Sequence, residues 1–422
     1  MSTMQQQAKQ IDDVFSAFSV ACRVASPPNS FRASSYHSFA VERRPDVKVS
    51  KVTALAPELG EALGVPVRFD DMPLSIEVRR PDPQRLKLTD LWALLQKTPR
   101  EGLHTVTGEM VKSGKLMPAL VNLAHPNTPH ALIAGTTGSG KTALLISMLL
   151  SSAIMRSPNE LSLVVLDPKA VDFRTIYGLP HLAGQVVTEP SECVAALAAV
   201  VAEMERRKTT GMLEPRQKII VAIDEIAELM AIAGSEVEGY IQRIISVGRG
   251  LGIHLIGATQ KPSADVVGSV IKANFPVRIV GRVMTDSDAK VAAGISGTGA
   301  ESLPGMGSFL VVNGATHRVQ SFYATAEEQV QLVSMIGGKW AGQRTHFSLH
   351  LDDAPKVTER VEIAAMPQSS ADYPAWLVPA IRSYTNKHGK PPSQRRVQTK
   401  IQERTGKMLP WPLVKAALQD AM

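Results

Sequence analysis

The chain has 422 residues, enough for two or three domains, and its 44% apolar and 20% charged content is typical of a soluble globular protein. Its two cysteines, Cys22 and Cys193, form no metal-binding or redox motif, which excludes a disulfide scaffold and favours a reducing cytoplasm. The most apolar helical stretch, 143–155, is too short and too rich in serine to span a bilayer, and the N-terminus has no signal-peptide pattern. We therefore expect a cytoplasmic protein without direct membrane insertion.

The net charge of +7 is concentrated at the C-terminus. Residues 373–422 contain nine Lys and Arg side chains against two acidic ones, so this segment alone carries a charge equal to that of the whole chain. A concentrated basic region favours a polyanionic partner. A basic segment that is merely solvated is the alternative.

Residues 1–30 are expected to form an amphipathic helix and a linker. Within residues 1–24, four apolar residues recur at the i, i+3, i+4 and i+7 spacing of one helical face: Ile11, Val14, Phe15 and Phe18. This face is expected to pack on a neighbouring element. The segment 26–30, which contains two prolines, ends the helix.

Residues 31–128 are predicted to form a small α/β domain, because strand-like alternation and helical spacing both occur there. Its expected elements are strands at 38–43 and 66–79, helices at 52–63 and 88–95, and a hairpin at 104–123.

Residues 129–336 alternate between short apolar runs and helical segments. Continuous apolar runs are typical of parallel strands buried on both faces. The runs are 163–166, 219–223 and 255–258, the helical segments are 192–208 and 236–247, and a closing hairpin is expected at 308–313 and 319–323. This order predicts an α/β fold with a RecA-like P-loop ATPase core, whose mostly parallel sheet has helices on both faces.

The C-terminal part is expected to contain a linker at 337–372 and a basic helical domain at 373–422. Three helices are predicted there from apolar pairs at helical spacing: Leu377 and Ile381, Val397 and Ile401, and Val414 and Leu418. Three short helices with many basic residues fit a helix-turn-helix or winged-helix module. The candidate DNA-binding side chains in it are Arg395, Arg396 and Lys400.

One octapeptide fits the phosphate-binding pattern G-x-x-x-x-G-K-[ST]. It follows the strand-like run 131–134 and precedes the helix-like run 143–155, which is the context this motif requires. The residues are Gly135, Thr136, Thr137, Gly138, Ser139, Gly140, Lys141 and Thr142. Backbone N–H groups of such a loop point at phosphate oxygens, the lysine reaches the β- and γ-phosphates, and the hydroxyl of Thr142 can bind Mg²⁺. The pattern therefore predicts ATP and Mg²⁺ as ligands, the alternative being a chance glycine-rich turn.

Two acidic residues follow the apolar run 219–223. Asp224 is placed to hold Mg²⁺ and Glu225 to polarise the attacking water, which favours hydrolysis. Gln260, at the end of the next buried run, is a candidate contact to the γ-phosphate or to the water. The alternatives are an acidic turn for the first pair and a strand-capping amide for Gln260.

Arg249 lies in a glycine-flanked loop before the run 255–258. Hydrolysis requires positive charge at the transition state, and an arginine is often supplied by a neighbouring subunit. A solvated loop arginine is the alternative.

The chain resembles the FtsK/SpoIIIE family of DNA translocases, in the FtsK–HerA superfamily. The similar segments occur in the same order and at the same spacing: 134–141, 166–169, 203–207, 252–263, 271–278 and 299–307, together with 47–52 in the preceding domain. The similarity covers residues 40–325. One departure is Lys290, where the family usually has an arginine, because lysine loses bidentate phosphate geometry.

The resemblance implies a ring, expected to be a hexamer, that moves double-stranded DNA through its pore with ATP hydrolysed at subunit interfaces. It places Arg249 at the position of the trans-acting arginine and Lys272 near the DNA-gripping loops, where an interface salt bridge is the alternative. The membrane-spanning N-terminal region of the family is not found, so septum anchoring by this chain is not expected. Two alternatives to translocation stay open: a related ring that powers protein export, and a DNA-bound, ATP-dependent assembly switch.

Overall fold

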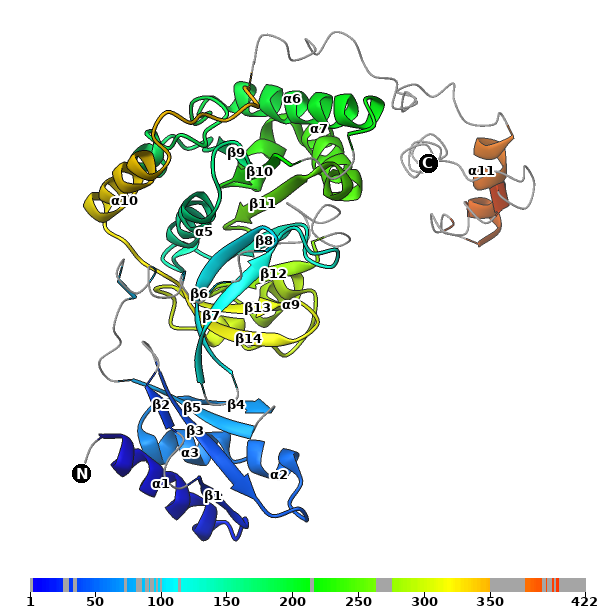
Figure 1. Cartoon of the computed structure of the whole chain (residues 1–422). Coiled ribbons are helices and arrows are strands. Elements are labelled where there is room, and N and C mark those ends of the chain that lie inside the picture. Colours follow the sequence, from blue (N-terminus) through cyan, green and yellow to red (C-terminus); the bar gives the residue numbers. More distant parts are fainter. Residues whose placement is uncertain are drawn as a thin grey trace. The chain divides into compact units, whose positions relative to one another are not determined.

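The computed structural model divides the chain into two compact units, residues 1–354 and 355–422 (Figure 1). It describes residues 3–25, 30–32, 36–71, 74–80, 101–112, 115–212, 216–262, 275–349 and 376–388, and separate positions at 86–87, 91, 95, 98, 392, 397 and 400–401. Within these residues, no helix combines the length and the apolar content needed to cross a bilayer.

The N-terminal part of the first unit is a five-stranded antiparallel sheet in the order β1-β3-β5-β4, with β2 on β3. Its elements are α1 (Thr3–Ala17), β1 (Cys22–Val24), β2 (Ser30–Arg32), β3 (Tyr36–Arg43), α2 (Val49–Thr53), α3 (Ala56–Leu63), β4 (Val67–Asp71) and β5 (Leu74–Arg79). The expected apolar face of α1 is confirmed in part: Ile11 and Phe15 are fully buried in the core of this sheet and Val14 packs partly buried against it, but Phe18 is 49% exposed. The helix ends at Ala17, earlier than predicted.

A nine-stranded sheet forms the larger part of the first unit, in the order β7-β6-β14-β13-β12-β8-β11-β10-β9. The strands are β6 (His104–Lys112), β7 (Lys115–Asn122), β8 (Ala131–Ala134), β9 (Leu161–Leu166), β10 (Lys218–Ile223), β11 (Ile253–Thr259), β12 (Val277–Val280), β13 (Ser308–Val312) and β14 (Thr316–Gln320). Strands β12, β8, β11, β10 and β9 are parallel, and the rest pair antiparallel. The predicted parallel core and closing hairpin are both confirmed.

The hairpin β6–β7 corrects one expectation, because we placed it in the small domain and it instead extends the nine-stranded sheet. Its apolar side chains join the same core as helix α5 (Lys141–Met155). Two hydrogen bonds fix it there: the hydroxyl of Thr105 donates to the carbonyl of Met148, and the N–H of Val106 donates to the hydroxyl of Ser151. An edge hairpin with an apolar face needs such a partner to exclude water from that face.

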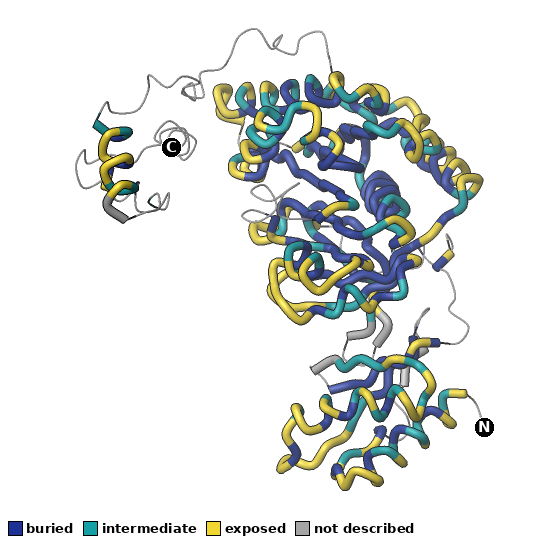
Figure 2. Tube along the Cα trace, turned by 180° about the vertical axis from the view of Figure 1, so that it is seen from behind, coloured by how far each residue is buried: buried dark blue, intermediate teal, exposed yellow. Residues whose placement is uncertain are grey.

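Helices cover both faces of the parallel strands. In Figure 2 the strands are buried and lie between helices that are more exposed on their outer sides. Alternate residues of β10 face opposite layers: Ile220 packs with α5, and Ile219 packs with helices α6 and α7. This two-sided burial explains why the strand is apolar throughout. The remaining elements of the unit are α6 (Pro190–Thr209), α7 (Ile226–Val247), α9 (Asp286–Ala293), α10 (Ala326–Lys339), η1 (Arg174–Ile176), η2 (Gly248–Leu251) and η3 (Ala300–Ser302).

The second unit contains helix α11 (Leu377–His388), the first of the three predicted helices. Leu377 and Ile381 are buried with Val397 and Ile401, so the first two apolar pairs form one small core. The pair Val414 and Leu418 lies outside the described residues. The predicted start of the linker at residue 337 is wrong, because helix α10 continues to Lys339.

Candidate active site

The glycine loop joins β8 to α5 and is anchored on both neighbouring strands. Gly138 and Gly140 adopt positive φ angles of 80° and 95°, a conformation that favours glycine. On one side, the N–H of Gly135 donates to Thr259 at the end of β11. On the other side, the N–H of Thr136 donates to the carbonyl of Arg282, just after β12. The loop is therefore held open at the N-terminus of α5, where anions bind.

Lys141 and Thr142 meet Asp224 at the carboxyl end of β10. The Lys141 Nζ donates to the carbonyl (2.5 Å) and to the Oδ1 (2.8 Å) of Asp224, and the Thr142 hydroxyl donates to the same Oδ1 (3.1 Å). The side chains of Lys141 and Asp224 are 4% and 0% exposed. The glycine loop thus meets this strand end, as predicted.

These residues fit a magnesium ion. The Oδ2 of Asp224 is buried and has no hydrogen-bond partner within the described residues. A buried carboxylate oxygen without a donor is costly unless a ligand satisfies it. Carboxylate and hydroxyl oxygens are the ligands that Mg²⁺ prefers, so Asp224 and Thr142 would hold it together with phosphate oxygens.

Glu225 and Gln260 lie side by side at the same edge of the sheet. Both carboxylate oxygens of Glu225 accept from the backbone N–H of Gln260 at 3.1 Å, and its Oε2 is 3.2 Å from the Nζ of Lys169. The amide oxygen of Gln260 accepts from the Thr137 hydroxyl at 3.1 Å. The two residues predicted to act on the attacking water therefore lie beside the glycine loop.

Two further carboxylates gather here that the sequence reasoning did not assign. Asp167 follows β9, and its Oδ1 is buried without a partner in the described part of the chain. Burial raises the pKa of Asp172, and the nearby carboxylates of Asp224 and Asp167 raise it further. The signal available in the sequence was the acidic residue directly after a buried strand. Asp167, Asp172 and Asp224 are thus close enough to interact electrostatically.

Arg249 lies at the opposite edge of the sheet, in η2 directly before β11. A seven-residue strand separates this edge from Gln260, a distance of about 23 Å. The side chain is exposed, and among the described residues it makes no hydrogen bond or ion pair. One copy of the chain therefore does not bring Arg249 to its own glycine loop.

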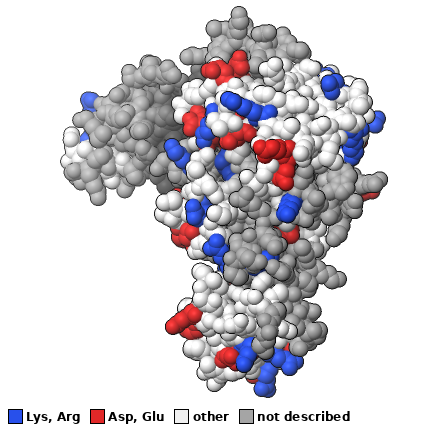
Figure 3. Space-filling view, turned by 90° about the vertical axis from the view of Figure 1, so that its left-hand side faces the viewer, with Lys and Arg blue, Asp and Glu red and all other residues white. Residues whose placement is uncertain are grey.

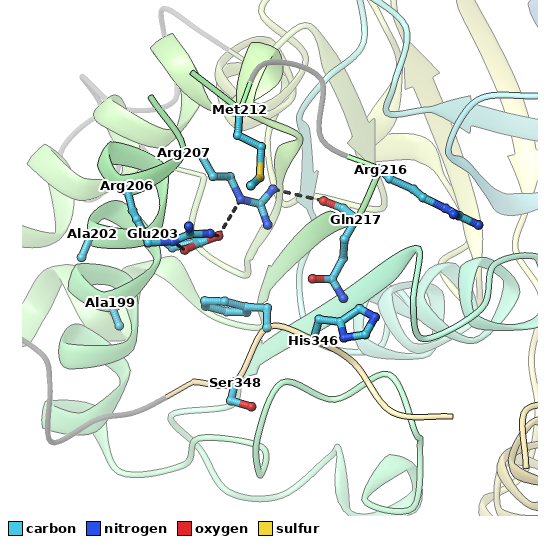
Figure 4. Close-up of a pocket in the computed structure, with 11 residues that line it drawn as sticks. Ala199, Ala202, Glu203, Arg206, Arg207, Met212, Arg216, Gln217, His346 and Ser348 are labelled. Atoms are coloured by element: carbon cyan, nitrogen blue, oxygen red, sulfur yellow. Dashed lines mark hydrogen bonds and ion pairs between the residues drawn. The ribbon is translucent and has the colours of Figure 1, made fainter. Parts of the chain in front are cut away.

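A pocket of about 930 Å³ also opens at this opposite edge, between α6, the start of β10 and the segment 346–348 (Figure 4). Two of the arginines that line it, Arg206 and Arg207, are already hydrogen-bonded within the chain. Arg207 is buried and donates to Glu203 and to the carbonyls of Gln217 and Leu251, and Arg206 also bonds to Glu203. The pocket is separate from the glycine loop and adds nothing to that site.

The candidate DNA contacts are only partly described. Lys272, Arg395 and Arg396 lie outside the described residues, and Lys400 is exposed in the second unit. On the face shown in Figure 3, acidic and basic side chains are interspersed over the described residues. Lys290 is exposed in the last turn of α9.

The strand, glycine loop and helix N-terminus, with a strand-end aspartate and glutamate opposite the lysine, define a P-loop ATPase of the RecA type. A sequence model of the FtsK/SpoIIIE family matches residues 96–212 and 208–264. With this match and those of the relatives below, the chain belongs to the FtsK/SpoIIIE family.

Two relatives are both named DNA translocase FtsK. The protein from Listeria monocytogenes is 30% identical over 84% of this chain and 50% of its own length. The protein from Campylobacter jejuni is 37% identical over 69% of this chain and 33% of its own length. The chain thus spans half or less of the length of these relatives.

Solved structures agree with the fold. The pCW3 conjugation coupling protein TcpA, in a monomer form with ATPγS, superposes with a TM-score of 0.52 at 22% identity, covering 78% of this chain and 99% of that one. The cytoplasmic domain of the Thermomonospora curvata type VII secretion ATPase EccC gives a TM-score of 0.51 at 23% identity, covering 64% of this chain and 34% of that one.

Proposed function

We propose that this protein hydrolyses ATP and uses the energy to move double-stranded DNA, working as a ring of identical subunits that we expect to be a hexamer. The observation that carries the proposal is the separation of the catalytic groups within one chain. Lys141, Asp224 and Glu225 are assembled at one edge of the sheet, and Arg249 is exposed at the other. A site that requires both is complete only where two copies meet.

The residues act on ATP in distinct ways. The Nζ of Lys141 is bound to Asp224, and phosphate oxygens of ATP would replace that partner. Thr142 and Asp224 would hold Mg²⁺, which supplies charge neutralisation at the phosphates. Glu225 orients and deprotonates the attacking water, Gln260 positions the water or the γ-phosphate, and Arg249 of a neighbouring copy stabilises the transition-state charge.

Duplex DNA is the proposed cargo because the relatives named above are DNA translocases and because the net charge of the chain is concentrated in its C-terminal segment. We assign phosphate contacts to Lys272, Arg395, Arg396 and Lys400. Such contacts are independent of base sequence and weaken as salt increases. Action in the cytoplasm belongs to the same proposal, as expected from the two free cysteines.

Measuring the ATP hydrolysis rate with and without duplex DNA tests the proposal. Stimulation by duplex DNA, together with ATP-dependent displacement of a third strand from a triplex, is the expected result. A rate indifferent to DNA would favour the protein-export alternative. DNA binding without triplex displacement would favour the assembly switch.

A further inference from the structure

The positions of the groups at the γ-phosphate end determine on which side of β8 the sugar and base of the nucleotide lie. The groups that define the γ-phosphate end, Asp224, Glu225 and Gln260, belong to β10 and β11, which lie on one side of β8. The phosphates are held by the loop that follows β8 itself. The sugar and base therefore leave on the other side of β8, toward the ends of β12 and β13.

Two exposed side chains, Arg282 and Met306, lie on that side of β8, beside the glycine loop. Arg282 follows β12, and its carbonyl accepts from both the N–H (2.8 Å) and the hydroxyl (3.0 Å) of Thr136. Its side chain is exposed and, within the described part of the chain, makes no hydrogen bond or ion pair. Met306 precedes β13 and is 81% exposed, a high value for a large apolar side chain.

The backbone holds Met306 in this exposed position. Its N–H donates to the carbonyl of Gly138 at 3.1 Å, and its own carbonyl accepts from the side chain of Gln320 at 3.0 Å. Its φ angle is 51°, a left-handed conformation that a residue with a side chain adopts at a cost. Non-glycine residues in this conformation cluster at functional sites, where the surrounding contacts impose it.

Arg282 and Met306 share one corner of the molecule. A β-carbon built on Gly305 would lie 3.1 Å from the carbonyl oxygen of Gly138 and 3.9 Å from the guanidinium carbon of Arg282. The guanidinium is therefore next to both the glycine loop and the Gly305–Met306 turn. Met284, 79% exposed, follows two residues after Arg282.

We propose that Arg282 and Met306 form a clamp for the nucleobase of the bound nucleotide, with the base stacked against the guanidinium plane and the thioether. A planar arginine and a polarizable methionine are both favourable partners for an aromatic ring. The inference rests on the proposed nucleotide site and adds to it the surface that binds the base.

The test measures binding of two ligands to the full chain by calorimetry: ATP with Mg²⁺, and inorganic tripolyphosphate, which has no base. Met306→Ala and Arg282→Ala should each weaken ATP binding about threefold, and the double variant about tenfold, from the usual strength of such contacts. Tripolyphosphate affinity should not change in Met306→Ala, and in Arg282→Ala it should fall less than ATP affinity, because only the long-range attraction of the guanidinium for the phosphates is lost. Met335→Ala, on the exposed surface of α10, is the matched control.

Met306→Gly separates the side chain from the backbone, because glycine adopts positive φ without cost. It should lose as much ATP affinity as Met306→Ala. Retention of full affinity by the glycine variant would overturn the clamp, and so would unchanged ATP binding in the double variant. An equal loss for tripolyphosphate would place Arg282 on the phosphates instead. If the unaltered chain binds neither ligand, the nucleotide site itself is wrong, and the two failures are thereby distinguished.

Discussion

The two edges of the parallel sheet treat their charged groups in opposite ways. At the carboxyl edge, Lys141 and Asp224 are almost completely buried and bound to each other. At the amino edge, Arg249 is exposed and has no polar partner among the described residues, although Arg207 nearby is buried and fully engaged. Lys141 and Asp224 thus satisfy each other, whereas Arg249 has no polar partner in the described part of the chain.

In the proposed function, the carboxyl edge binds the nucleotide, and the arginine at the amino edge completes the catalytic site of a neighbouring copy. A buried lysine that is already paired can exchange one anion for another, so the carboxyl edge can bind phosphate without a large rearrangement. An exposed arginine without a polar partner among the described residues is available to another molecule, as the proposed function requires of Arg249. The comparison predicts that variants at the two edges fail in different ways.

Lys141→Ala should have the largest effect, because it removes the group that binds the β- and γ-phosphates. Losing a buried charged partner costs about 3 kcal/mol, or roughly a hundredfold in ATP affinity, and turnover should be undetectable. The measurement is ATP binding by calorimetry. The variant also removes the ammonium group that pairs with the buried carboxylate of Asp224, so a thermal unfolding measurement must show that the chain is still folded. Tight ATP binding by a folded variant would contradict the assignment.

Arg249→Ala should bind ATP normally and lose turnover by about a thousandfold, because it removes transition-state charge but no ground-state contact. Mixing it with Lys141→Ala should restore part of the activity, since some interfaces then combine an intact glycine loop with an intact arginine. Arg216→Ala, exposed at the same edge, is the control and should keep near-normal turnover. Mixed assemblies that form without recovering activity would contradict action between subunits.

Glu225→Gln should reduce turnover by about a hundredfold while ATP binding is kept, because the amide cannot accept a proton from water. The measurement compares single-turnover hydrolysis with ATP affinity. Glu228→Gln, one helical turn away and exposed, should behave as the unaltered protein. Near-normal hydrolysis by Glu225→Gln would remove this residue from the mechanism.

The sequence predicted the carboxyl edge well because its signals are local. Lys141, Asp224, Glu225 and Gln260 each end or begin a continuous buried element, and parallel strands bring such ends together. The contact of Lys169 with Glu225 was not predicted, because a lysine after a strand has several possible acceptors.

Other parts could not be predicted because they depend on long-range packing. The hairpin β6–β7 carries the alternation of any half-buried strand pair, and only the core around α5 determines which sheet it joins. The proximity of Met306 to Gly138 joins residues far apart in the chain. The sheet that the hairpin joins and the contact of Met306 with Gly138 are therefore known only from the three-dimensional structure.

The amino edge also contains a buried side chain that titrates near neutral pH when the chain is unfolded. His254, in β11, donates from Nδ1 to the carbonyl of Pro129 at 3.1 Å, and its buried Nε2 has no partner within the described residues. Burial lowers the pKa of His254 to about 3, well below its ordinary value. Below the ordinary pKa the unfolded chain binds a proton that the folded chain does not, so stability is present above about pH 6.5 and falls as the pH decreases.

His254→Asn should weaken this pH dependence, because asparagine keeps a donor for Pro129 and does not titrate. From about pH 7 to about pH 5.5, the unaltered chain should lose about 1 kcal/mol more of its free energy of unfolding than the variant. Urea unfolding at the two pH values measures the difference, with His125→Asn on the surface as control. Equal losses in all three proteins would show that His254 is protonated in the folded state, and that the amino edge tolerates a buried charge as the carboxyl edge does.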